Sequence, residues 1–189
     1  MHARDLGYIA LSTALLAISA WVAIPLGGIP ITLQTLVLCL LAGLLGGKRA
    51  ELSVVAYVLL GSVGTPVFAG FSGGLGVLLS PTGGYLVGFL PFVLLVGFTA
   101  DATANVSSWK GKFLLLAAAG LGLLLCYAIG TVWFVLVTAQ ESAKIGFLAA
   151  LTTCVLPYLP IDAVKIILAV FLIGKLRKYV KQDKQSKQR

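Results

Sequence analysis

The chain has 189 residues, of which 59% are hydrophobic and 11% are charged, and its formal net charge is +8. Its mean hydropathy of +1.04 excludes an ordinary soluble domain and predicts a small α-helical protein that crosses a membrane several times. The one histidine, His2, lies at the terminus, and the three cysteines lie in separate apolar runs. We therefore expect no metal site, no cofactor and no disulfide framework.

Six apolar regions are long enough, or nearly so, to cross a hydrocarbon core about 30 Å thick. In chain order, we expect crossings at residues 6–24, 31–45, 52–68, 85–98 with their flanks and 113–137, and a sixth within residues 145–174. The first region is longer than the apolar part of a usual signal peptide, and Asp5 lies in its charged start. We therefore expect this region to remain as a helix.

Pro157 and Pro160 divide the last apolar region, because a proline removes a backbone donor and clashes with the preceding turn of a helix. Residues 145–156 are therefore predicted to form a short segment at the outer surface. The sixth crossing is expected to begin near Pro160, since proline is favoured at the first position of a helix.

The positive charges gather on alternate connections and so predict an orientation. They lie at Arg4, Lys48, Arg49, Lys110, Lys112 and in the tail 175–189, whereas connections 25–30 and 69–79 have no Lys or Arg and 140–144 has only Lys144. Because cytoplasmic loops carry the excess of Lys and Arg, we expect six transmembrane helices with both termini in the cytoplasm. Residues 1–189 then form one transmembrane domain with a basic tail near anionic lipid, and the charge requires no nucleic-acid partner.

Two outward connections, residues 23–35 and 64–85, are rich in glycine and proline and lead into polar residues that open the next helix. Glycine lets a backbone approach a ligand closely, and irregular backbone at membrane depth must be covered by protein or line a cavity. These segments are predicted to be the lid and walls of an outward-facing pocket. Ordinary tight turns would have the same composition.

Asp162 and Lys165 are the ionisable pair inside the last crossing. Asp162 lies about 20 Å along a helix from Lys175, which places its carboxylate within the membrane. Charged groups at that depth mark functional sites by default. The i, i+3 spacing puts both side chains on one helix face, where they either satisfy each other or offer an acceptor and a donor to a polar solute. The two interpretations are compatible.

Catalytic patterns are missing from the sequence. Residues 42–49 have alanine at position 42, where a phosphate-binding loop has its first glycine, and no Ser or Thr follows Lys48, so the chain is not expected to hydrolyse ATP by that route. No nucleophile motif or paired carboxylates appear either, which argues against an enzyme. A stand-alone secondary transporter or facilitator stays the alternative, although Asp101 is the one further acid available for an ion relay.

Five motifs resemble one known family over nearly the whole chain. They are Pro-Ile-Thr-Leu-Gln-Thr-Leu (30–36), Ala-Gly-Leu-Leu-Gly (42–46), Gly-Leu-Gly-Val-Leu (74–78), Ser-Pro-Thr-Gly-Gly-Tyr-Leu-Val-Gly-Phe (80–89) and Pro-Ile-Asp-Ala-Val-Lys (160–165). The chain resembles BioY, the biotin-binding S components of energy-coupling factor (ECF) transporters. The resemblance implies a six-helix bundle in the plasma membrane of a prokaryote. It also implies a partnership with a transmembrane coupling subunit and two cytoplasmic ATPases.

The resemblance also implies which residues bind biotin and which bind the partner. The expected substrate-binding residues are Asp162, Lys165, Gln34, Thr35, Ser80, Thr82, Gly83, Gly84, Tyr85, Phe71 and Tyr158. Ala10 and Ala14, an Ala-xxx-Ala pattern in the first helix, are expected to dock on the coupling subunit. Some family members have a basic residue in or near the fourth helix. Residues 85–98 contain no Arg or Lys, so recognition of the biotin carboxylate is expected to come from elsewhere.

Overall fold

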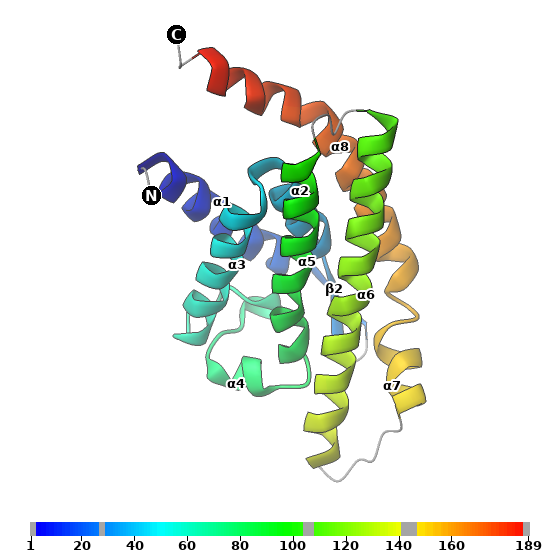
Figure 1. Ribbon diagram of the computed structural model, residues 1–189. Coiled ribbons are helices and arrows are strands. Elements are labelled where there is room, and N and C mark those ends of the chain that lie inside the picture. The colour runs from blue at the N-terminus through cyan, green and yellow to red at the C-terminus, as the bar shows by residue number, and fades with distance from the viewer. Residues whose placement is uncertain (1–2, 27–28, 104–107, 141–146, 187–189) are drawn as a thin grey trace.

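The computed structural model describes residues 3–26, 29–103, 108–140 and 147–186. The described elements are α1 (Ala3–Trp21), β1 (Ala23–Leu26), β2 (Ile29–Thr32), α2 (Gln34–Leu45), α3 (Gly47–Ser62), a 3-10 turn (Ala69–Phe71), α4 (Leu75–Leu79), α5 (Gly83–Ala102), α6 (Trp109–Gln140), α7 (Phe147–Cys154) and α8 (Leu159–Ser186). The longer helices form an elongated bundle (Figure 1). The start of α1 and the end of α8 lie at one end, and α4 and α7 lie at the other.

Each of the six predicted apolar regions overlaps one of the longer helices: α1, α2, α3, α5, α6 and α8. Two of these, over Gly83–Ala102 and Trp109–Ala139, are long and apolar enough to cross a membrane. By contrast, α2 has only 12 residues and spans about 18 Å. Two parts of the sequence prediction lie outside the described residues. They are Lys144, the one Lys or Arg of connection 140–144, and the start of the segment predicted at 145–156.

The first outward connection is not irregular, as its composition suggested, but forms a small antiparallel hairpin. Strands β1 and β2 pair from Ala23 with Thr32 to Leu26 with Ile29. Pro25 lies opposite Pro30, and a two-stranded sheet tolerates both prolines because each strand is an edge. The isoleucines in these strands favour the extended conformation. The fold is therefore a helical bundle with one β-hairpin.

The proline-rich break lies where the sequence predicts it. Helix α7 ends at Cys154, a turn follows, and α8 begins at Leu159 with Pro160 in its first turn. The first turn needs no backbone donor from Pro160, so the proline starts the helix without a lost hydrogen bond. Asp162 consequently lies one turn into α8, at the N-terminal end of the helix.

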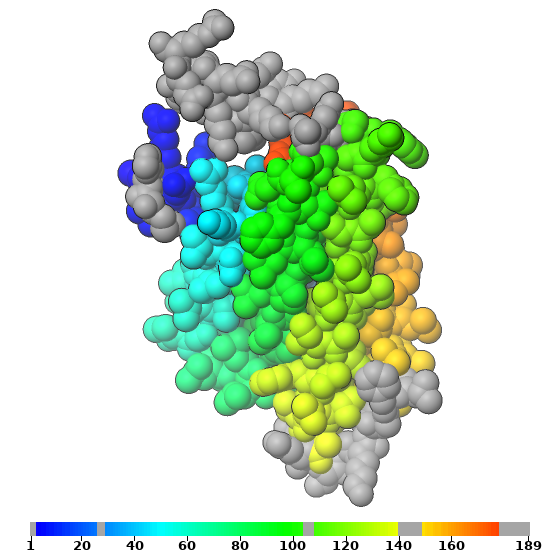
Figure 2. Space-filling model, in the orientation of Figure 1, coloured from blue at the N-terminus to red at the C-terminus, as the bar shows by residue number. Residues whose placement is uncertain are grey.

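Small residues let the helices pack closely around a core that α2 shares with α5 and α8. A Cβ atom at Gly88 of α5 would lie 2.9 Å from Cys126 Cα of α6, and one at Gly43 of α2 would lie 2.3 Å from Ile173 Cδ1 of α8. The contact between α5 and α6 is the most extensive in the described part of the chain. Figure 2 shows α3, α5 and α6 packed side by side along one face.

Charged residues fasten the end of the bundle where the α2–α3 turn lies. Asp101 accepts a hydrogen bond of 2.9 Å from the Gly47 backbone N–H, and Arg177 approaches the same carboxylate at 3.7 Å. The Arg177 guanidinium also donates to the Ala100 carbonyl. In addition, Arg49 pairs with Asp5 at 2.7 Å and joins α3 to α1. Asp101 therefore has a structural role at the junction of α2, α3, α5 and α8.

We predict that Gly88→Ala lowers the stability of the bundle by about 1–3 kcal/mol, since the new methyl group would overlap backbone of α6 that cannot move aside easily. The matched control is Gly120→Ala in α6, where no atom lies within 4 Å of the added Cβ. Thermal unfolding of both purified variants in detergent measures the difference. Equal melting temperatures would contradict the close α5–α6 packing.

Candidate functional site

A pocket of about 210 Å³ lies under the hairpin, among α2, α5, α6, α7 and α8. Seven of the residues expected to bind substrate line it: Gln34, Thr35, Thr82, Tyr85, Tyr158, Asp162 and Lys165. Much of the remaining wall is apolar, and includes Leu86, Phe89 and Leu123. A mostly apolar cavity with a few placed polar groups is typical of small-molecule sites.

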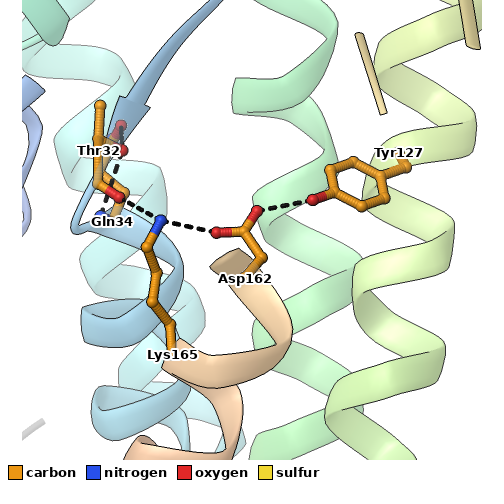
Figure 3. Close-up of polar contacts among 5 residues, drawn as sticks. All are labelled: Thr32, Gln34, Tyr127, Asp162 and Lys165. Atoms are coloured by element: carbon orange, nitrogen blue, oxygen red, sulfur yellow. Dashed lines mark hydrogen bonds and ion pairs between the residues drawn. The ribbon is translucent and has the colours of Figure 1, made fainter. Parts of the chain in front are cut away.

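A chain of polar contacts crosses this pocket from α6 to the hairpin (Figure 3). Tyr127 of α6 donates a 2.7 Å hydrogen bond to Asp162 Oδ2, and Lys165 Nζ donates one of 2.7 Å to Asp162 Oδ1. The same ammonium donates to the backbone carbonyl of Thr32 at 2.7 Å. The two charged groups thus satisfy each other and connect three separate parts of the fold.

The ion pair is largely removed from solvent, since 11% of each side chain is exposed. A carboxylate oxygen has two lone pairs, and each oxygen of Asp162 uses one in the contacts described. The Lys165 ammonium has three N–H groups and uses two. The pair can therefore accept further hydrogen bonds and donate one more to a bound molecule while its internal contacts remain.

Gln34 has a positioning role beside the pair. Its Nε2 donates to Tyr57 Oη at 3.0 Å, and its Oε1 accepts from Thr32 Oγ1 at 3.0 Å. The Tyr57 hydroxyl in turn donates to the Val67 carbonyl at 3.1 Å. These contacts hold the end of β2 against α2 and α3, so the Thr32 carbonyl is fixed where Lys165 reaches it.

The hairpin is fastened over the pocket from α8 and from the turn before it. The Thr32 carbonyl accepts from Lys165, and the Ile29 carbonyl accepts from the Tyr158 hydroxyl. The two acceptors lie at opposite ends of β2. Because both ends of this strand are held, the hairpin forms a roof whose position depends on the polar residues beneath it.

Four of the expected substrate-binding residues lie outside the described lining of this pocket. Ser80 Oγ donates to the Val77 carbonyl at 2.6 Å and lies 2.9 Å from Thr82 Oγ1, which shapes the turn between α4 and α5. A Cβ atom at Gly83 would lie 1.8 Å from the Leu78 oxygen, and one at Gly84 would lie 2.2 Å from Trp133 Cβ. Both glycines therefore serve close packing in this structure.

Phe71 is the fourth of these residues, and it stacks on Trp21 of α1 with ring centres 5.1 Å apart. Its residue surface is 63% exposed. The two alanines expected to face a partner, Ala10 and Ala14, are both exposed on α1. Their spacing of four residues puts them on one face of that helix.

Tyr127 is the functional candidate that the sequence did not indicate. It lies within a long apolar run, where a single tyrosine is common and has no informative spacing to Asp162, 35 residues later. In the part of the chain that the structure describes, no three His, Cys, Asp or Glu side chains gather as metal ligands would. The described lining offers hydrogen bonding by one carboxylate, one ammonium and neutral polar side chains.

Comparison with known proteins gives consistent matches over most of the chain. The model of the BioY family matches residues 1–182. A biotin transporter BioY of Thermotoga maritima is 36% identical over 166 residues, which cover 88% of this chain and 91% of that protein. A biotin transporter BioY of Rhodobacter capsulatus is 35% identical over 187 residues, which cover 93% and 94%.

A solved structure matches the fold as well. The crystal structure of the S-component for biotin from an ECF-type ABC transporter has a TM-score of 0.81 and 32% identity, and the match covers 94% of this chain and 95% of that one. With two helices long and apolar enough to span a bilayer, these relatives identify a membrane protein. The chain belongs to the BioY family.

Proposed function

We propose that this chain is the biotin-binding S component of an ECF-type transporter, which captures biotin outside the cell for uptake. The observation that carries the proposal is the buried Asp162–Lys165 pair in a covered, mostly apolar pocket. Relatives named biotin transporters align with nearly the whole chain, and the structure that matches the fold is a biotin S-component. The chain is then a substrate-binding subunit and not an enzyme.

The chemistry of biotin complements this pocket. Biotin has a ureido group with two N–H donors and one carbonyl, an apolar ring that contains a thioether, and a carboxylate at the end of an apolar tail. Asp162 accepts from one ureido N–H group, and the third N–H of Lys165 donates to the neighbouring ureido oxygen. Charge-assisted hydrogen bonds in a dry site are the strong kind. Leu86, Phe89 and Leu123 pack against the apolar ring.

The charge of the pocket favours this orientation of biotin. Lys165 is the one cation among the described lining residues, and it is 2.7 Å from the Asp162 carboxylate. A biotin carboxylate placed at Lys165 would also lie close to Asp162, and two neighbouring carboxylates repel each other. The neutral ureido end avoids this repulsion. We therefore assign the carboxylate tail to the part of the pocket farther from Asp162.

Transport requires a membrane orientation and partners, which we infer from the charge pattern and the family. We propose six transmembrane helices, cytoplasmic termini and a location in the plasma membrane, with a coupling subunit and two ATPases supplying the energy. A membrane-impermeant thiol reagent applied to intact cells should label Val63→Cys, whose parent residue is 87% exposed, and should spare Lys48→Cys. Labelling of Lys48→Cys alone would reverse the proposed orientation.

The whole proposal is tested by uptake of labelled biotin into proteoliposomes. Liposomes that contain this chain with the coupling subunit and ATPases should accumulate biotin when ATP is inside, and liposomes with the chain alone should not. The chain alone should nevertheless bind biotin tightly. Uptake by the chain alone, driven by an ion gradient, would favour a stand-alone secondary transporter.

We predict that Asp162→Asn and Lys165→Ala each weaken biotin binding by at least ~2 kcal/mol, because each change leaves a desolvated partner unpaired. Calorimetric titration of the purified variants measures the loss. Glu51→Gln is the matched control, since it neutralises an acid of α3 that lies outside the described lining of the pocket. If both site variants bound biotin as tightly as the parent, the ion pair would have only a structural role.

Tyr127→Phe should weaken biotin binding by about 0.5–1.5 kcal/mol, less than the loss of either charged group. The change removes the hydroxyl that donates to Asp162 Oδ2 and keeps the packing of the ring. Tyr8→Phe, on the exposed part of α1, is the matched control. Unchanged affinity for Tyr127→Phe would show that Asp162 needs no support from α6.

Ala14→Leu should leave biotin affinity unchanged and reduce co-purification with the coupling subunit, because a larger side chain blocks close helix approach at a small-residue face. Ala117→Leu makes the same change at an exposed position of α6 and should retain the partner. A pull-down with a tagged coupling subunit compares the two variants. Equal retention would remove Ala10 and Ala14 from the docking surface.

A further inference from the structure

A second cavity, separate from the biotin pocket, lies between α6 and α8. Its volume is about 200 Å³, and its walls include Trp109, Phe113 and Leu116 of α6 and Ile167, Val170 and Phe171 of α8. No described residue lines both cavities. Phe113 is 66% exposed and Ile167 is 57% exposed, so the groove opens on the outer surface of the bundle. In a membrane protein, such an apolar surface faces lipid tails.

Two lysines stand at this groove without a negative partner among the described residues. Lys112, itself part of the lining, places its Nζ 5.3 Å from the centre of the Phe171 ring. Lys175 places its Nζ 4.6 Å from the centre of the same ring. Neither lysine belongs to any of the ion pairs of the described residues. The groove therefore joins an apolar wall to two positive charges that have no acidic partner among the described side chains.

The position of the groove agrees with the depth of a lipid headgroup. It lies near the start of α6, at the end of the bundle that also holds the start of α1 and the α2–α3 turn (Figure 1). Trp109, 85% exposed, stands at this end, and tryptophan is enriched where hydrocarbon meets the polar headgroups. Lysines at this level attract anionic lipids.

We propose that this groove binds one acidic phospholipid of the membrane. The lipid phosphate lies between the ammonium groups of Lys112 and Lys175, and an acyl chain lies along the apolar wall that ends at Leu116 and Ile167. Charge complementarity favours an anionic headgroup over a zwitterionic one. The apolar wall favours a lipid over free phosphate, which would leave that wall uncovered. A bound lipid would fill the space between α6 and α8, which both supply residues to the biotin pocket.

The test is native mass spectrometry of the delipidated chain with equal amounts of palmitoyl-oleoyl phosphatidylglycerol and the phosphatidylcholine with the same acyl chains. We expect one phosphatidylglycerol molecule to be retained in preference to phosphatidylcholine. Lys112→Ala with Lys175→Ala should reduce that preference roughly 30-fold. The matched control is Lys48→Ala with Lys110→Ala, which removes the same charge from exposed lysines outside the groove and should change it little.

A further variant tests the apolar wall, and biotin titration of every variant confirms that it is folded. Ile167→Trp should fill the groove and lower retention of both lipids while the two lysines remain. Equal retention of the two lipids by the parent would overturn the proposal. An equal loss of the preference for phosphatidylglycerol in the Lys48→Ala, Lys110→Ala control would also overturn it. That result would mean that the preference comes from the overall positive charge of this surface and not from the groove. Loss of the coupling subunit in the groove variant, with lipid preference unchanged, would assign the groove to a protein partner instead.

Discussion

The buried ion pair of Asp162 and Lys165 is the interaction on which the site depends. Two charges removed from water cost several kcal/mol each unless hydrogen bonds satisfy them. Here Tyr127 supports the carboxylate, and the Thr32 carbonyl supports the ammonium. Because these supports come from α6 and from the hairpin, the pair can persist only if three separate parts of the chain meet. The cost of burying charge thus fixes the architecture of the pocket.

This arrangement links ligand binding to the roof of the pocket. The same ammonium that is available to a ligand also holds the hairpin at Thr32, and Tyr158 holds the hairpin at Ile29. A ligand that accepts a hydrogen bond from Lys165 either replaces the bond to the Thr32 carbonyl or uses the third N–H group and leaves that bond intact. Much of the remaining wall is apolar, and its helices pack closely, since glycines such as Gly88 bring α5 against α6. The charged groups that can recognise a ligand therefore lie where the hairpin is attached to α8.

The sequence predicted the features that depend on local spacing. The i, i+3 positions of Asp162 and Lys165 and the proline break before them follow from the geometry of one helix, and the apolar runs predicted the longer helices. Tyr127 was not predicted, because its contact with α8 depends on how helices distant in sequence pack. The stacking of Phe71 on Trp21 was not predicted for the same reason, and the assignment of Phe71 to the biotin site stays a prediction. Composition also did not distinguish the hairpin from an irregular loop.

The most direct test of the account is a crystal structure of the purified chain with biotin bound. The account predicts biotin in the pocket under the hairpin, with one ureido nitrogen within hydrogen-bond distance of Asp162 and the ureido oxygen near Lys165. Tyr127 should still contact the Asp162 carboxylate in that complex. Biotin density at another place on the protein, with the ion pair unchanged and unengaged, would contradict the central claim that this pair recognises the vitamin.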